Sequence, residues 1–139
     1  MSTETKELTI NTERETEIID ITRDVQNIVS KSKIKNGIVS LFVVGSTGAL
    51  TTMEYEPGLI RDIPLALERL FPSNIRYYHQ ERWHDDNGHS HVRASFLGSS
   101  FTIPLINGNL PLGTWQQIVF IELDVRPRTR KILVQIVGE

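Results

Sequence analysis

The sequence predicts an α+β fold, a mostly antiparallel β-sandwich or flattened barrel with about two helices packed on one side. Short runs rich in β-branched and aromatic residues follow one another at regular spacing, separated by Gly, Asn and Pro turns. Only two stretches place apolar residues at helical spacing. The 139 residues contain no repeat and no linker-like segment, so residues 1–139 are expected to form a single domain.

Each expected element follows from a local pattern in the sequence. Apolar residues at helical spacing indicate a helix at about 21–32, ended by Asn36-Gly37. A second helix is expected from Pro57-Gly58 to just before Pro72. Strands are expected near 8–10, 18–21, 38–44, 50–54, 91–97, 101–106, 115–123 and 131–137. The short spacing of the last four runs favours antiparallel pairing.

The composition narrows the classes of function. A net charge of −2 indicates no general attraction to nucleic acid or to an anionic membrane. No apolar run approaches the length of a membrane span, and the N-terminus lacks the pattern of a signal peptide, so a cytoplasmic protein is expected. The absence of cysteine excludes disulfides and thiol nucleophiles. Any metal must therefore be bound by His and by oxygen ligands.

A polar segment carries all four histidines of the chain within thirteen residues: His79, His84, His89 and His91. It also contains Glu81, Asp85, Asp86 and Asn87. Imidazole and carboxylate groups bind divalent metals and transfer protons near neutral pH. We predict metal ligation by His79, His89 and His91, since His89 and His91 are two residues apart and on a strand would both point to one face. The alternative is a solvated polar loop, in which Asp85 to Gly88 form only a turn.

Two further segments are candidates for ligand binding. Gly45-Ser46-Thr47-Gly48 offers backbone N–H groups and hydroxyls suited to phosphate, although a tight turn is an equally good interpretation. Glu54 ends the strand that follows. Gly113-Thr114-Trp115-Gln116 begins a strand, where Trp115 is either a core residue or a stacking platform for a heteroaromatic ring.

The last turn of the chain is rich in arginine. Arg126, Arg128 and Arg130 surround Pro127, and an arginine binds phosphate through two parallel hydrogen bonds. A basic turn is also an ordinary solvated edge. We expect one of these side chains to meet an anion.

Taken together, three blocks of this sequence resemble the YjbQ-like family, whose members are known as secondary thiamine-phosphate synthases. The blocks are GSTGALTTMEYEPGLIRDIP at 45–64, YHQERWHDDNGHSHVRASFLGSSFTIPLINGNLPLGTWQQIVFIE at 78–122 and RPRTRKILVQIVGE at 126–139. Ser90-His91, the Gly113 to Gln116 run and Arg130 together are more specific than any single motif. Many bacterial relatives carry His where this chain has Gly45.

The resemblance implies a homotrimer with sites near subunit interfaces. It also implies the joining of hydroxymethylpyrimidine diphosphate to hydroxyethylthiazole phosphate, with magnesium or another divalent metal as cofactor and small phosphorylated heterocycles as partners. The expected catalytic residues are His91, His79, Asp86 and Glu54. The expected substrate-binding residues are Ser46, Thr47, Asn87, Ser90, Thr114, Trp115, Gln116, Arg128 and Arg130. The alternatives are a non-catalytic trimer that binds a phosphorylated metabolite or a metal, and a metal-dependent phosphohydrolase.

Overall fold

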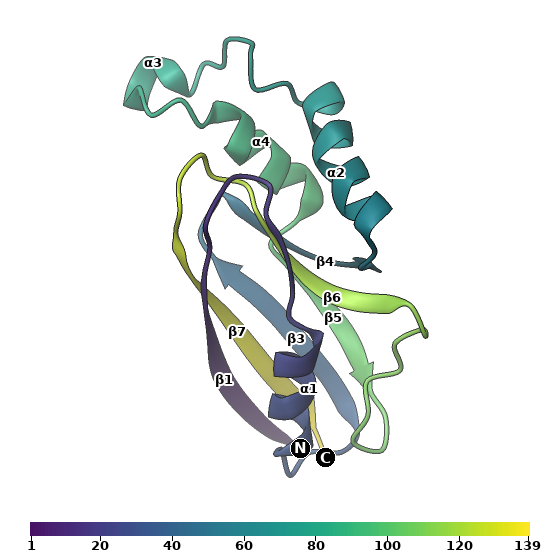
Figure 1. The fold of residues 1–139 in the computed structure, drawn as a ribbon. Helices are drawn as coiled ribbons and strands as arrows, with labels where there is room; N and C mark the ends of the chain where they lie inside the picture. Colours follow the sequence, from purple (N-terminus) through teal and green to yellow (C-terminus); the bar gives the residue numbers. More distant parts are fainter.

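The computed structural model describes residues 1–139, folded as two antiparallel sheets and four helices (Figure 1). The strands are β1 (Ser2–Asn11), β2 (Ile18–Asp20), β3 (Gly37–Val44), β4 (Gly48–Glu54), β5 (Ser100–Leu105), β6 (Gln116–Glu122) and β7 (Thr129–Gly138). The helices are α1 (Thr22–Ser30), α2 (Pro57–Leu70), α3 (Gln80–Trp83) and α4 (Gly88–Leu97). The α+β class predicted from the sequence is therefore confirmed.

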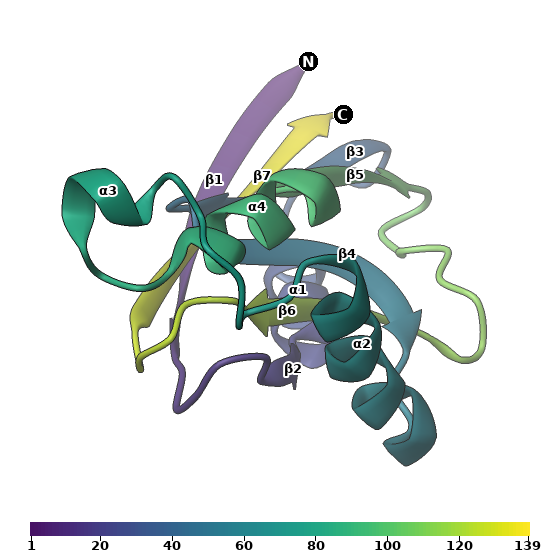
Figure 2. The same ribbon diagram turned by 90° about the horizontal axis from the view of Figure 1, so that it is seen from above.

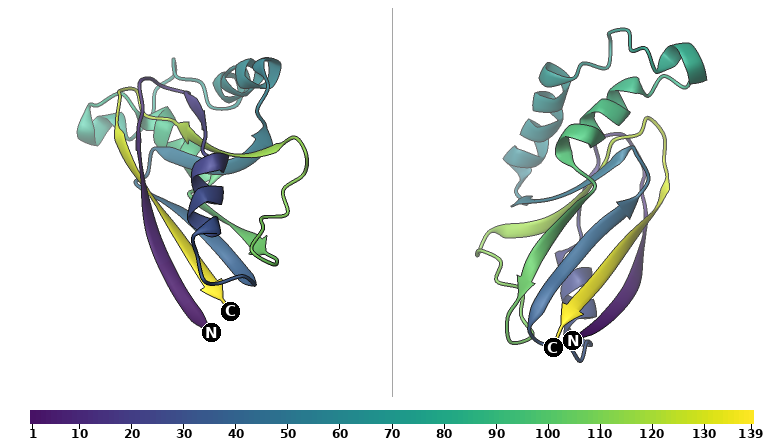
Figure 3. Two further views of the ribbon diagram at one scale, coloured as in Figure 1. Left: turned by 60° about the horizontal axis from the view of Figure 1, so that its bottom comes forward. Right: turned by 180° about the vertical axis from the view of Figure 1, so that it is seen from behind.

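The two sheets differ in their number of strands. The first sheet has four strands in the order β1-β7-β3-β5, and the second has three in the order β2-β6-β4. All neighbouring strands are antiparallel. Strand β1 pairs with β7 from Ser2 opposite Gly138 to Asn11 opposite Thr129. This register brings the two chain ends together at the end of the molecule farthest from α3 and α4 (Figures 1 and 3).

The main core lies between the sheets and follows the alternation of strand side chains. In β3 the side chains of Val39, Leu41 and Val43 are fully buried, whereas the residues between them point outward. Phe120 of β6 faces this core from the other sheet. Helix α1 covers one side of this core with three buried residues at helical spacing, Ile21, Val25 and Val29. This spacing is why the helix predicted at 21–32 was correct.

A second, smaller core forms on the outer face of the three-stranded sheet. Helices α2 and α4 cover this face, as the view from above shows (Figure 2). Leu67 of α2 and Ala94 of α4 pack against Val119 and Ile121 of β6. Helix α2 begins where the Glu56 carboxylate accepts hydrogen bonds from the N–H groups of Gly58 and Leu59. The outer face of the four-stranded sheet carries no helix (Figure 3).

The prediction of a strand at 91–97 was wrong, because this segment forms helix α4. Val92, Ala94 and Phe96 alternate with polar residues as in a strand, but only Ala94 is buried and Phe96 is 74 % exposed. The buried positions instead recur at helical spacing, at 89–90 and 93–94. Gly98, with φ of +99°, ends the helix.

Two smaller differences complete the comparison with the sequence. Helix α3 is a single turn within the segment expected to be a loop, and together with α4 it gives the fold four helices rather than two. Trp115 lies in a turn just before β6 instead of beginning the strand. No helix in the structure is both apolar enough and long enough to cross a lipid bilayer.

Candidate functional site

A buried ion pair joins the two sheets at the end of the sandwich that faces α4. Arg130 of β7 is 2 % exposed and Glu122, the last residue of β6, is fully buried. The Arg130 guanidinium donates from Nε and Nη2 to the two carboxylate oxygens of Glu122, at 2.8 and 2.5 Å. Thr12 Oγ1 and the backbone N–H of Asp124 donate to the same carboxylate. Every charge of the pair is therefore met by a partner, as burial requires.

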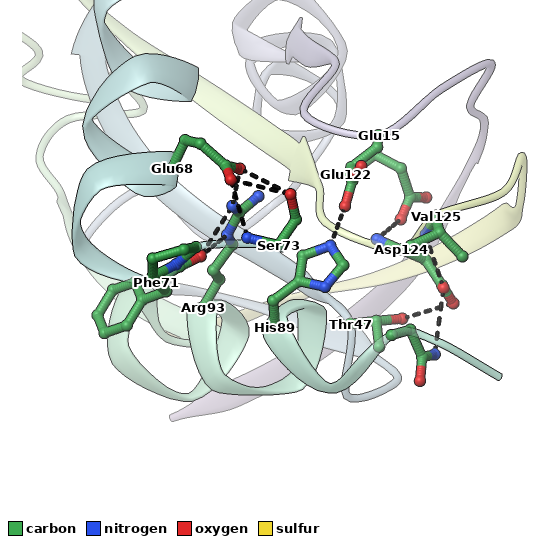
Figure 4. A network of polar contacts seen from close by, with 12 residues as sticks. Glu15, Thr47, Glu68, Phe71, Ser73, His89, Arg93, Glu122, Asp124 and Val125 are labelled. Atoms are coloured by element: carbon green, nitrogen blue, oxygen red, sulfur yellow. Dashed lines mark hydrogen bonds and ion pairs between the residues drawn. The ribbon is translucent and has the colours of Figure 1, made fainter. Parts of the chain in front are cut away.

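Thr47 and Asp124 extend this pair toward helix α4. Arg130 Nη2 donates to the carbonyl oxygen and to the hydroxyl of Thr47, at 2.9 and 2.8 Å. The Thr47 hydroxyl donates to Asp124 Oδ2 at 3.1 Å, and Asn87 Nδ2 donates to Asp124 Oδ1 at 3.2 Å. Arg128 lies 3.3 Å from Asp124. Figure 4 shows Thr47 and Asp124 beside the first turn of α4.

Two histidines meet next to this network. His79 precedes α3 and His91 lies in the first turn of α4, and their ring centroids are 4.3 Å apart. His79 Nε2 also lies 3.4 Å from Asp85 Oδ1, without forming a hydrogen bond. The short loop between α3 and α4 thus folds the polar segment back on itself and brings together side chains twelve residues apart.

Three buried polar atoms in this region have no hydrogen-bond partner: His79 Nε2, Asn87 Oδ1 and Ser90 Oγ. Ser90 is fully buried and Asn87 is 7 % exposed. Leaving a buried polar atom unpaired costs about 1–3 kcal/mol, so such atoms are uncommon in folded proteins. All three atoms belong to the polar segment between His79 and His91.

The surroundings of this site shift two pKa values downward. Burial, followed by the nearby His79, lowers the pKa of His91, while Asp124 and Asp85 act in the opposite direction. Burial alone would raise the pKa of Asp124, but hydrogen bonds from Val125, Asn87 and Thr47 and the charge of Arg128 outweigh it and lower the pKa. Near neutral pH the site therefore contains a neutral imidazole at His91 and a carboxylate at Asp124.

His89 does not join the other two histidines. Residues that are two positions apart on a helix lie on nearly opposite sides of it. His89 therefore points toward the β1–β2 loop, where its ring contacts Glu15 (Figure 4). The expected arrangement of His89 and His91 on one face of a strand is therefore wrong. No three His, Asp or Glu side chains lie close enough to hold a metal ion between them. His79 and His91 alone form an incomplete set of metal ligands.

The expected site residues divide into two groups at opposite ends of β4 and β6. Thr47, Asn87, Ser90, His79, His91, Arg128 and Arg130 lie at the α4 end. Glu54 and Gln116 are paired across the strands at the other end, beside Thr114 and Trp115. The six residue steps of β4 correspond to about 20 Å. A single chain therefore does not bring Glu54 or Trp115 to the histidines.

Two expected residues lie at the edge of the α4 group. Ser46 is exposed in the β3–β4 turn. Asp86 is exposed at a positive φ of 60°, and its backbone N–H donates to Gln80 Oε1. The turn interpretation of Asp85 to Gly88 accounts for the position of Asp86.

Sequence reasoning missed Glu122 and Asp124, which lie at the centre of the network. Both are in the run Ile118 to Asp124, where two carboxylates follow a completely apolar stretch. An acidic residue inside an apolar strand is rarely buried without a partner. That pattern, together with Arg130 at an inward position of β7, was the available signal.

The fold and this His–Asp site define a two-sheet α+β domain with a polar site at one end of the sandwich. A family model described as UPF0047 protein YjbQ-like matches residues 6–139. The chain belongs to this family, as the sequence resemblance predicted.

Relatives and solved structures agree with this membership. A UPF0047 protein of Methanothermobacter thermautotrophicus is 44% identical over 139 residues, which are 100% of this chain and 95% of the relative. The UPF0047 protein YugU of Bacillus subtilis is 32% identical over 96% of this chain and 98% of its own. The crystal structure of a protein of unknown function from Sulfolobus solfataricus has a TM-score of 0.94 at 39% identity and covers 99% of both chains.

These comparisons overturn the predicted thiamine-phosphate synthase activity. The Methanothermobacter and Bacillus relatives are named only as UPF0047 proteins. The Sulfolobus protein is described as of unknown function, and a structure from Clostridium acetobutylicum, with a TM-score of 0.86 at 38% identity, as an uncharacterized conserved protein. The resemblance identified the family correctly, but membership of this family does not support a thiamine-phosphate synthase activity.

Replacing Arg130 with Met should destabilise the fold by about 3–5 kcal/mol, because the buried Glu122 carboxylate would lose its charged partner. Lys131→Met is the control, since the Lys131–Glu7 pair is about half exposed and should contribute at most about 1 kcal/mol. Urea unfolding monitored by circular dichroism measures both. Equal effects of the two substitutions would contradict a structural role for the buried pair.

Lowering the pH from about 7 to about 5 should reduce stability partly through His91. Its lowered pKa means that the folded protein favours the neutral ring, whereas the unfolded chain takes up a proton near the ordinary value of 6.5. The stabilisation is therefore complete above that value and is lost as the pH falls. His91→Gln should lose less stability than the wild type over this range, and the exposed His84→Gln should behave as the wild type. Parallel unfolding profiles for all three proteins would refute this.

Proposed function

We propose that the protein binds a divalent cation at His79 and His91 and, through this cation, a small phosphorylated metabolite. The observation that carries the proposal is the pair of imidazoles 4.3 Å apart beside the Asp124 carboxylate. Neutral imidazole binds Zn²⁺, Ni²⁺, Cu²⁺ or Fe²⁺ better than Mg²⁺. The donor set therefore favours a transition metal over the magnesium expected from the resemblance.

The negative charges of the site and its unpaired acceptor atom favour binding of a cation over binding of an anion alone. Asp124 and Asp85 act on His91 as negative charges, and the unpaired Asn87 Oδ1 can only accept. An anion placed here alone would face these carboxylates. A cation held by the two imidazoles would offset these negative charges and would offer a phosphate oxygen a direct bond.

The two imidazoles leave most coordination positions to other groups. A metal that keeps open positions is typical of sites that bind or activate a ligand, whereas structural sites are closed. Asn87 and Thr47 would hold the Asp124 carboxylate in place, as outer partners commonly do for metal sites. A small phosphorylated metabolite with its own oxygen ligands suits such an open site, in a protein we place in the cytoplasm.

Titration with Zn²⁺ or Co²⁺, followed by calorimetry, should show one saturable site per chain. His79→Ala and His91→Ala should each weaken the affinity by at least about 100-fold, and Asp124→Asn by about 10–100-fold. His84→Ala is the matched control, because His84 lies in the same segment and is exposed. A simple phosphate monoester should bind more tightly when the cation is present.

Binding that is unchanged in His91→Ala, or equally weakened in His84→Ala, would contradict the proposal. Circular dichroism of each variant without metal separates a loss of ligands from a loss of fold. A monoester affinity that does not depend on the cation would leave the cation site intact but reject its link to the phosphorylated ligand.

We also propose that the protein assembles as a homotrimer. The uncovered face of the four-stranded sheet exposes apolar side chains of β3, with Ile38, Phe42 and Val44 between 44 % and 48 % exposed. Trp115 is 71 % exposed. Exposed apolar groups of this kind mark association surfaces. Assembly would also allow Trp115 and Glu54 of one subunit to approach the histidines of another, which a single chain does not permit.

Light scattering coupled to size exclusion should give a mass of about 47 kDa, three times the chain mass of 15.8 kDa. Phe42→Lys should lower the mass toward that of one chain, because a charge on the buried face of an interface is costly. Asn27→Lys, at an exposed position of helix α1 away from this sheet face, should leave the mass unchanged. A wild-type mass of 15.8 kDa would refute the assembly.

A further inference from the structure

A polar hollow lies between the β3–β4 turn and the C-terminal half of helix α4. Its volume is about 220 Å³, far more than the about 10–15 Å³ that one water molecule needs. The β3–β4 turn lines it on one side and the second half of α4 with the α4–β5 loop on the other. The lining residues are Gly45, Ser46, Gly48, Ala94, Ser95 and Ser99. None of them is charged.

The two glycines of the lining lie directly against the Arg130 guanidinium. A Cβ atom on Gly45 would lie 3.0 Å from Arg130 Nη1, and one on Gly48 would lie 3.6 Å from Cζ and 2.7 Å from the Phe120 ring. Gly45 also has a φ of +133°, which L-residues rarely adopt. Arg130 itself is not a lining residue, but Nη1 lies directly behind Gly45, and no Cβ atom at either glycine stands between the guanidinium and the hollow.

The hydrogen bonds of Arg130 leave this nitrogen free. Nε donates to Glu122, and Nη2 donates to Glu122 and Thr47. Nη1 makes no hydrogen bond within the chain, although Arg130 is 98 % buried. A guanidinium has five N–H donors in a fixed plane, and the two on Nη1 point away from the Glu122 edge. A buried arginine thus presents two unused donors beside a hollow lined by hydroxyls.

The charges around the hollow favour an oxygen anion. The Glu122 carboxylate is already met by Arg130, by the hydroxyl of Thr12 and by the N–H of Asp124. No acidic side chain lines the hollow. Ser46 and Ser99 carry hydroxyls that make no hydrogen bond within the chain, whereas Ser95 Oγ donates to the carbonyl of His91. Two hydroxyls and two guanidinium N–H groups can therefore donate to one ligand.

From this arrangement we infer an oxyanion subsite that takes the phosphate group of a small molecule, with Arg130 Nη1, Ser46 and Ser99 as donors. The subsite rests on the proposed function only for the idea that the ligand carries phosphate. It uses none of the histidines. Thr47 connects the two places, because its hydroxyl accepts from Arg130 and donates to Asp124. A phosphorylated ligand would then have the bound cation on one side of Thr47 and Arg130 on the other side.

The test is titration of the protein with inorganic phosphate in the presence of EDTA, so that the cation site is not involved. Amide shifts of ¹⁵N-labelled protein should move at Gly45, Ser46 and Ser99 and should saturate. Ser46→Asp places a carboxylate at the mouth of the hollow without disturbing the buried ion pair. It should weaken phosphate binding by at least about tenfold. A parallel arm with glycerol 3-phosphate separates the two sources of phosphate, because tighter binding of the ester indicates a metabolite.

Asn27→Asp is the matched control. Asn27 is exposed on helix α1 and does not line the hollow, so this variant should bind phosphate within about twofold of the wild type. Equal weakening in the two variants would overturn the subsite, because it would show only a general effect of charge. So would the absence of saturation, or shifts confined to His79 and His91. Loss of zinc binding in His91→Ala with phosphate binding intact would support a subsite that is separate from the histidines.

Discussion

The ion pair of Arg130 and Glu122 is the constraint on which the rest of this end of the molecule depends. It joins a strand of the four-stranded sheet to a strand of the three-stranded sheet, with both side chains removed from solvent. A buried pair stabilises a protein only when its geometry is good and its remaining hydrogen bonds are satisfied. Thr12 and Thr47 supply those bonds from two different turns. The pair therefore sets the positions of both turns, and through Thr47 and Asp124 the position of the first turn of α4.

The general architecture was readable from the sequence because its signals are local. Strand β3 alternates inward and outward side chains without interruption, and helix α1 carries a regular apolar stripe. The strand prediction for the α4 segment was wrong because it rested on Val92 and Phe96, and neither side chain is buried in the helix. The polar segment from His79 to His91 was found from composition. Its partners Glu122 and Asp124 were not, because their role depends on contacts between strands that are distant in the chain.

The family resemblance establishes the fold of this chain but not its activity. The shared motifs identify a chain whose relatives have the same fold over nearly their whole length, but fold and activity are separate properties. The chemistry of this chain is defined by its own side chains: a pair of adjacent imidazoles, a carboxylate held by three hydrogen-bond donors, and an arginine with unused donors. His89, bound to Glu15, instead fastens the β1–β2 loop to α4 and contributes to the shape of the site rather than to its ligands.

The pairing of β1 with β7 has a practical consequence. Ser2 lies opposite Gly138, so both ends of the chain leave the molecule at one point, at the opposite pole from α3 and α4 (Figure 1). Ends that lie close together tolerate being joined, and new ends can then be opened in an exposed turn. A surface tether or a fluorescent fusion at either terminus would leave the histidine pair facing away from the attachment. The protein is therefore well suited to immobilised formats in which small molecules flow past the free pole.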